Sequence, residues 1–97
     1  MRKRKIRGVC ALPKNSVFFP GEKNQENNAV VLTLDEYEVI RLVDYERLSQ
    51  EESGELMSVS RATAQRIHRS ARNKIATALV EGRTLRIEGG EYQLDKE

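Results

Sequence analysis

The chain has 97 residues, which suffice for one domain with a single hydrophobic core. Only 38% of the residues are apolar and 33% are charged, and the apolar runs are far shorter than the roughly 20 residues of a membrane-spanning helix. The lone Cys10 excludes an internal disulfide framework, and the basic start has no apolar stretch of a signal peptide behind it. We therefore expect a cytoplasmic protein that does not enter a membrane.

The net charge of +2 conceals three segments of strong charge. Residues 1–14 hold six basic side chains and no acid, and residues 61–74 hold five and no acid. Residues 34–56, between them, hold eight acids and two arginines. Such asymmetry favours a polyanion partner on one side of a small domain, although a basic tail and a solvated helix face would produce the same charges.

The first segment, residues 1–28, is predicted to be a basic arm followed by a loop. Residues 16–19 can form a short strand, and Pro20-Gly21 with the polar run after it indicates irregular structure. The arm could enter a DNA minor groove or could trail in solvent and add only non-specific affinity. Its candidate DNA contacts are Arg2, Lys3, Arg4, Lys5 and Arg7.

The central segment, residues 29–82, is predicted to form the main helical domain. After a short strand at 29–32, Thr33 and Glu36 have the spacing of a capping box that opens a helix over 34–46. Apolar residues at intervals of three support that helix.

Two further helices are predicted in the same segment. Ser49 and Glu52 form a second capping box, which opens a helix over 50–57. Ser60 is an expected N-cap for a third helix over 61–80, and Gly82 is well placed to end it.

The last segment, residues 83–97, is predicted to be a β-hairpin and a tail. Residues 84–88 and 91–94 both alternate apolar and polar side chains, and Gly89-Gly90 separates them in the manner of a tight turn. The hairpin could touch DNA as a wing, but we favour packing against the N-terminal strands or a second subunit.

The helices predicted over 50–57 and 61–80 have the layout of a helix-turn-helix, in which one helix lies in the DNA major groove and the other braces it. Gly54 would allow the two helices to approach closely, Ser58 would occupy the left-handed turn position, and Val59 would plug the turn. An ordinary α-hairpin has the same outline. The basic segment falls on the second of these helices, which favours the DNA-binding interpretation.

The second helix of this pair is predicted to read bases. Arg can bond guanine with two hydrogen bonds, Gln can do the same with adenine, and Ala can touch the thymine methyl group. The residues predicted to contact bases are Arg61, Ala62, Gln65 and Arg66. The residues predicted to contact the DNA backbone are Gln50, Ser60, Thr63, Arg69, Arg72 and Lys74.

Catalytic and metal chemistry find little support in the sequence. Zinc needs about four ligands, whereas Cys10 and His68 are the only Cys and His of the chain. No nucleophile-and-base arrangement is evident, and Gly89-Gly90 lacks the context of a phosphate-binding loop. We therefore expect neither an enzyme nor a bound cofactor or metal.

The chain resembles a bacterial and archaeal family called domain of unknown function 134. The motifs LTLDEYE, LSQEE, VSRAT and LRIEGG carry the resemblance, together with Arg7-Gly-Val-Cys10 in the arm. The resemblance implies a mainly α fold with a three-helix helix-turn-helix domain similar to sigma-factor region 4, and a DNA-binding role. Ile6 stands where many members carry a second cysteine, and Ser53-Gly54 replaces an alanine pair.

The expected function is sequence-specific binding of double-stranded DNA by a transcriptional regulator. A homodimer is the expected unit, because a single module of this size offers a limited interface. Two alternatives stay open: a module that docks on RNA polymerase through the acidic helices, and an RNA-binding protein.

Overall fold

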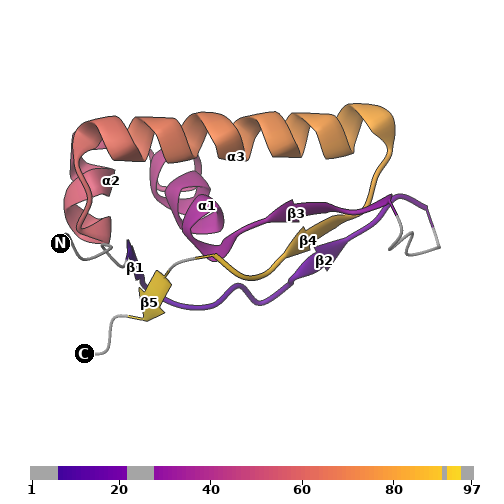
Figure 1. Ribbon diagram of the computed structural model, residues 1–97, viewed down its shortest axis with the longest axis horizontal. Coiled ribbons are helices and arrows are strands. Elements are labelled where there is room, and N and C mark those ends of the chain that lie inside the picture. Colours follow the sequence, from indigo (N-terminus) through magenta and orange to yellow (C-terminus); the bar gives the residue numbers. More distant parts are fainter. Residues whose placement is uncertain (1–6, 22–27, 91, 95–97) are drawn as a thin grey trace, which may run out of the picture.

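The computed structural model describes residues 7–21, 28–90 and 92–94. The helix α3 (Arg61–Glu81) runs the length of the molecule, and α1 (Leu34–Val39) and α2 (Gln50–Met57) gather beneath its N-terminal half (Figure 1). A small sheet lies beneath its C-terminal half. The fold is therefore mainly α, as predicted. No helix in these ranges is long and apolar enough to span a bilayer.

Capping residues set the starts of α1 and α2. The Thr33 N–H donates to the Glu36 carboxylate over 2.9 Å at the start of α1. At the start of α2, the Ser49 hydroxyl accepts from the Glu52 N–H over 3.0 Å, while the Ser49 N–H donates to the Glu52 carboxylate over 2.9 Å. These reciprocal bonds satisfy N–H groups that have no partner within the helix. Both predicted helix starts are confirmed.

The predicted ends of α3 are confirmed as well. The Ser60 hydroxyl accepts from the Thr63 N–H over 3.1 Å at the N-terminus. At the other end, Gly82 has a φ of 66°, a left-handed conformation that Gly adopts without strain.

The helix predicted over 34–46 changes type part-way. After α1, residues Ile40–Tyr45 form the π-helix η2, in which the Glu46 N–H donates to the Arg41 carbonyl over 2.8 Å. Arg47, with a φ of 65°, then ends the helical segment. The predicted span is right, but the prediction of a continuous α-helix is wrong, because apolar spacing does not specify the hydrogen-bond ladder.

The main sheet consists of three strands. Its central strand β4 (Leu85–Ile87) pairs antiparallel with β2 (Val17–Phe18) on one edge and parallel with β3 (Val30–Leu32) on the other. A separate parallel pair joins β1 (Arg7–Val9) to β5 (Tyr92–Leu94). The predicted strands near 16–19 and 29–32 are confirmed.

The predicted hairpin of 84–94 is wrong, although β4 and β5 are both strands. Both edges of β4 are already occupied by β2 and β3, so β5 has no edge of β4 to pair with. Gly89 and Gly90, with φ values of 73° and 89°, instead turn the chain toward the start of α1. There the Gly89 carbonyl accepts from the Leu34 N–H over 2.9 Å.

The core lies where the three helices meet the strands β3 and β4. Ala71 and Met57 are fully buried, and they join α3 and α2 to the core. The whole cluster comprises Leu32, Leu34, Val39, Leu42, Met57, Ile67, Ala71 and Ile87.

The N-terminal segment contributes to this folded body. Val9 is fully buried, and the Arg7 guanidinium lies 3.0 Å from the Asp35 carboxylate of α1. Arg7 was predicted as a possible DNA contact of a basic arm, whereas the structure holds it in the strand β1, next to Asp35. The other predicted arm residues, Arg2, Lys3, Arg4 and Lys5, lie outside the described residues.

Candidate nucleic-acid interface

The turn between α2 and α3 brings the two helices close together. Ser58 adopts the left-handed conformation with a φ of 61° and a ψ of 40°. A Cβ atom on Gly54 would lie 2.8 Å from the Val59 carbonyl oxygen, closer than Cβ atoms normally come to such an atom. Gly54 therefore permits the approach, as the sequence predicted.

The first half of α3 presents a basic face to solvent. Within the described ranges, the three arginines of this half make no hydrogen bond or ion pair. Its buried residues, Ala64 and Ile67, lie on the opposite side of the helix. The exposed residues, which we call the basic face, are Arg61, Ala62, Gln65, Arg66 and Arg69. The structure thus brings together all four predicted base-contacting residues and one predicted backbone contact.

The start of α3 adds polar groups next to the basic face. Ser60 is exposed, and its hydroxyl also donates to the Thr63 hydroxyl over 3.0 Å. The N-terminus of a helix carries partial positive charge and unpaired N–H groups, which suit a phosphate. Ser60 and Thr63, which were predicted to contact the DNA backbone, therefore lie next to the basic face at a helix end that suits a phosphate.

Arg72 is paired but accessible. Its guanidinium lies 3.1 Å from the Asp44 carboxylate, and 65% of its side chain is exposed. An ion pair between exposed groups contributes little free energy, about 0–1 kcal/mol, so a phosphate could displace Asp44. Arg72 thus remains compatible with a backbone contact.

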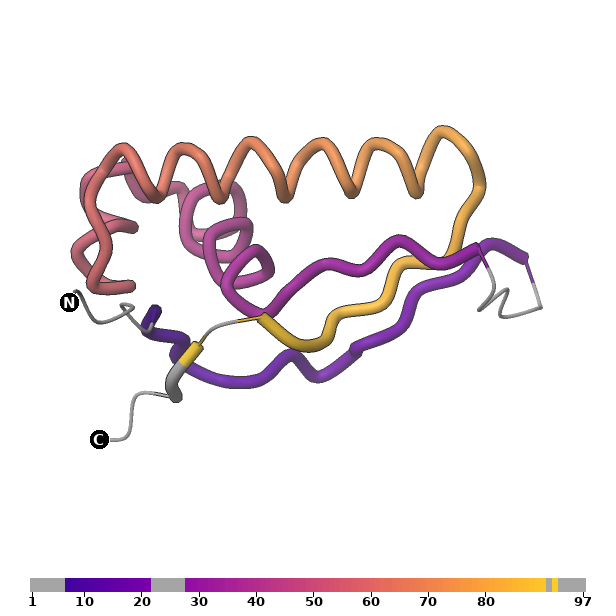
Figure 2. The backbone as a smooth tube through the Cα atoms, in the orientation of Figure 1, coloured from indigo at the N-terminus to yellow at the C-terminus, as the bar shows by residue number. Residues whose placement is uncertain are grey.

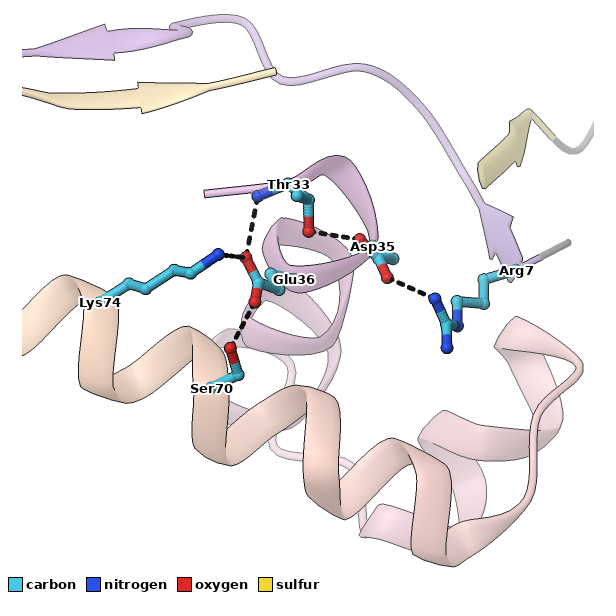
Figure 3. A network of polar contacts seen from close by, with 6 residues as sticks. All are labelled: Arg7, Thr33, Asp35, Glu36, Ser70 and Lys74. Atoms are coloured by element: carbon cyan, nitrogen blue, oxygen red, sulfur yellow. Dashed lines mark hydrogen bonds and ion pairs between the residues drawn. The ribbon is translucent and has the colours of Figure 1, made fainter. Parts of the chain in front are cut away.

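Lys74 is engaged on another side of α3 (Figure 3). Its ammonium group lies 2.8 Å from the Glu36 carboxylate, which also accepts from the Ser70 hydroxyl over 2.6 Å. Burial raises the pKa of Glu36, but the bonds from Lys74, Ser70 and the Thr33 N–H outweigh that effect and hold the pKa below 4.5. The structure therefore does not bring Lys74 to the basic face.

Gln50 also faces inward. Its side-chain nitrogen lies 3.0 Å from His68 Nδ1 on α3, and its oxygen is buried with no hydrogen-bond partner among the described residues. His68 Nε2 lies 2.7 Å from the Asp44 carboxylate. This chain of contacts links η2, α2 and α3, so Gln50 supports the position of α3 instead of joining the basic face.

The composition of this surface offers no set of metal ligands. Across residues 7–21, 28–90 and 92–94, no three His, Cys, Asp or Glu side chains lie together as a metal would require. Cys10 is exposed, and its N–H donates to the Glu38 carboxylate over 3.1 Å. The chemistry available at the basic face is hydrogen bonding and charge.

A family model described as "Protein of unknown function DUF134" matches residues 1–95. The chain belongs to the DUF134 family. This finding confirms the family resemblance of the sequence motifs.

The relatives are named UPF0251 proteins. One from Desulfitobacterium hafniense strain Y51 is 49% identical over 94 residues, which cover 96% of this chain and 75% of the relative. One from Ruminiclostridium cellulolyticum is 47% identical over 94 residues, covering 97% and 72%. One from Methanothermobacter thermautotrophicus is 43% identical over 95 residues, covering 98% and 50%. No solved structure matches the chain significantly.

Sequence reasoning missed the inward acids of this DUF134 chain. Asp35, Glu36 and Glu38 are all at least 93% buried on α1. Glu38 accepts from Arg41 over two bonds of 3.0 Å, and this pairing raises the pKa of Arg41. The sequence did contain a signal for this pairing, because an acidic segment lies next to a basic one. The acids and bases of two such segments can form ion pairs between packed helices, instead of lying on separate faces of the protein.

Proposed function

We propose that this DUF134 protein binds double-stranded DNA sequence-specifically as a transcriptional regulator. In this proposal α2 and α3 form a helix-turn-helix, and the first half of α3 lies in the major groove. The observation that carries the proposal is the basic face, where Arg61, Arg66 and Arg69 are exposed and lack partners among the described residues. A polyanion would supply the missing partners.

Base recognition falls to the residues nearest the turn. Arg61 and Arg66 can each bond guanine O6 and N7, and Gln65 can bond adenine N6 and N7. Ala62 offers a small apolar surface for a thymine methyl group. Their exposure at the N-terminal end of α3 fits the part of a recognition helix that reaches base edges.

Backbone contacts would flank these residues. Ser60 and Thr63 lie at the positive helix N-terminus, and Arg69 and Arg72 lie further along the exposed side of α3. We no longer assign this role to Gln50 and Lys74, because their side chains bond to His68 and Glu36.

Docking on RNA polymerase through the acidic helices has less support. The three acids of α1 are buried and bonded to Arg7, Arg41 or Lys74. Of these two helices, only α2 therefore offers exposed acids to a protein partner, namely Glu51, Glu52 and Glu55. RNA binding would use the same basic face, so the experiment must include RNA.

Selection from a random duplex library tests the proposal. The full chain should enrich a defined motif, and Arg66→Ala should bind the selected duplex more weakly and with relaxed preference at one position. Lys14→Ala is the matched control, because it removes one exposed charge from the segment that joins β1 to β2, which runs along the opposite side of the molecule from α3 (Figure 2). Failure to enrich a motif, or tighter binding to an RNA duplex of the same sequence, would refute the proposal.

A further inference from the structure

An apolar groove lies at the end of the molecule opposite α2. It has a volume of about 350 Å³ and opens between the C-terminal half of α3 and the strands β2 and β4. Its apolar lining includes Phe18, Phe19, Ile75, Ala78, Leu79 and Leu85. None of these residues belongs to the basic face.

Several apolar side chains on and beside this groove project into solvent. Leu79 is 81% exposed, while Phe18 and Phe19 are 51% and 42% exposed. With about 200 Å² for a large apolar side chain, these three residues present roughly 300 Å² of apolar surface. The largest apolar patch on a typical soluble monomer measures about 300–600 Å² and is often functional, so a patch of this size is compatible with an interaction site.

We infer that this groove is the surface on which a second copy of the chain docks. The projecting Leu79 and the groove with Phe18 and Phe19 lie next to each other. A two-fold axis between them would let each copy insert Leu79 against the aromatic rings of the other, which is the self-complementarity that a two-fold interface requires.

The charged residues at the edge of the groove also favour a second copy of the chain as the partner. Arg83 lines the groove, and its guanidinium lies 3.4 Å from the Glu81 carboxylate. Glu81 has 59% of its side chain exposed and Arg83 has 30% exposed. Across a two-fold axis, the cation of each copy can meet the anion of the other, so the polar rim is also self-complementary.

The area is sufficient for a weak dimer. Since about 60% of an interface is apolar, roughly 300 Å² of apolar surface corresponds to about 500 Å² in total for each copy. A standard stable interface buries about 800 Å² for each partner. We therefore expect self-association in the micromolar range.

The inferred dimer rests on the proposed function in one respect, which is its fit to DNA. Gln65 and Leu79 are separated along α3 by about 21 Å, from a rise of about 1.5 Å per residue. Two copies joined near Leu79 would hold their basic faces up to about 40 Å apart, and closer if the helices cross. Successive major grooves on one side of a duplex are about 34 Å apart.

Sedimentation of the full chain tests the surface without DNA. The wild type should form dimers at tens of micromolar, and Leu79→Arg should be monomeric. Leu79 is exposed, so this variant should keep the melting temperature of a folded protein. Leu56→Arg is the matched control, because Leu56 is a 55% exposed leucine on α2, and it should leave the dimer intact. A monomeric wild type at 200 µM, or dissociation by Leu56→Arg alone, would overturn the inference.

A second arm of the experiment uses duplexes with one or two copies of the selected motif. The wild type should bind the duplex with two motifs at least tenfold more tightly than the duplex with one motif. Leu79→Arg should bind both duplexes with the affinity that the wild type has for one motif. Wild-type binding as a monomer with no such gain would overturn the dimer and leave the proposed function standing. A dimer with no DNA affinity would leave the surface standing and refute the proposed function.

Discussion

Both halves of α3 carry basic side chains, but those of the first half lack acidic partners among the described residues, whereas those of the second half form ion pairs. In the first half, Arg61, Arg66 and Arg69 are exposed and have no partner among the described residues. In the second half, Arg72 and Lys74 pair with acids of η2 and α1. The sequence shows one continuous basic segment, whereas tertiary contacts divide it into a free part and a bonded part.

The division has a simple geometric origin. The acids Glu36 and Asp44 lie beneath the middle of α3, where they reach its second-half cations. The first turns of α3 pack against α2, whose own acids Glu51, Glu52 and Glu55 are exposed. The lesson is that a basic segment indicates a polyanion surface only after its internal partners have been subtracted.

The largest expected effect comes from the free half. Arg61→Ala with Arg66→Ala should reduce affinity for the selected duplex about 30- to 1000-fold, since each base contact contributes about 1–2 kcal/mol. The free energy of unfolding should change by less than about 0.5 kcal/mol, because exposed residues without partners contribute little. Fluorescence anisotropy and urea unfolding measure the two quantities, and a loss of affinity under threefold would contradict the assignment.

The bonded half should behave in the opposite way. Glu36→Gln weakens the contact with Lys74 and should lower the free energy of unfolding by about 1–3 kcal/mol. DNA affinity should stay within about twofold, because Lys74 lies off the basic face. Urea unfolding of this variant beside Glu51→Gln, an exposed acid of α2, separates the loss of a buried bond from the loss of charge.

Acid titration sharpens the assignment of Glu36. Its pKa in the folded protein lies below the ordinary 4.5, so ionised Glu36 stabilises the fold above pH 4.5. That stability is lost as the pH falls through the lowered pKa of the folded state. The difference in unfolding free energy between wild type and Glu36→Gln should therefore shrink below pH 4.5, and a difference that widens toward acid pH would show that the pKa is raised.

A smaller effect is expected from the residue that positions the free half. Gly54→Ala places a Cβ atom 2.8 Å from the Val59 carbonyl, which should cost about 1–3 kcal/mol and be partly offset by the better helix propensity of Ala, about 1 kcal/mol. Urea unfolding should therefore show a net loss of about 1 kcal/mol. The neighbouring exposed Glu55→Ala should change stability by less than about 0.5 kcal/mol, and equal stability of the two variants would show that the approach is not tight.

The smallest effect should come from Arg72, the first cation of the second half of α3. Arg72→Ala should weaken DNA binding about two- to fivefold and alter stability by less than about 1 kcal/mol, because its pair with Asp44 is exposed. The loss should be similar for selected and unselected duplexes, as expected for a backbone contact. A loss confined to the selected duplex would instead place Arg72 among the base contacts.

Local signals predicted the helices because capping and termination act within a few residues. Thr33, Ser49 and Ser60 start helices with bonds to their own first turns, and Gly82 ends α3 with its left-handed backbone. Gly54 was likewise predictable, because the turn follows it closely in sequence. The basic face followed from the phase of the apolar stripe on α3.

The failures involve contacts between distant segments. The hairpin prediction failed because β2 and β3 occupy both edges of β4, and the strand β1, with which β5 pairs instead, gave no local signal. The bonds of Lys74 to Glu36 and of Gln50 to His68 depend on how helices pack. The π-helix η2 escaped prediction because its sequence fits an α-helix equally well.

The salt dependence of DNA binding tests the central claim most directly. Anisotropy titrations of one duplex between 50 and 200 mM salt should show affinity falling steeply for the wild type. For a chain with Arg61, Arg66 and Arg69 all changed to Ala, the slope of log affinity against log salt should be shallower by about 1, because Arg69 is assigned to a phosphate and the other two arginines to bases. The same slope in both proteins, or no binding by the wild type at 50 mM salt, would contradict the assignment of the basic face as the DNA-binding surface.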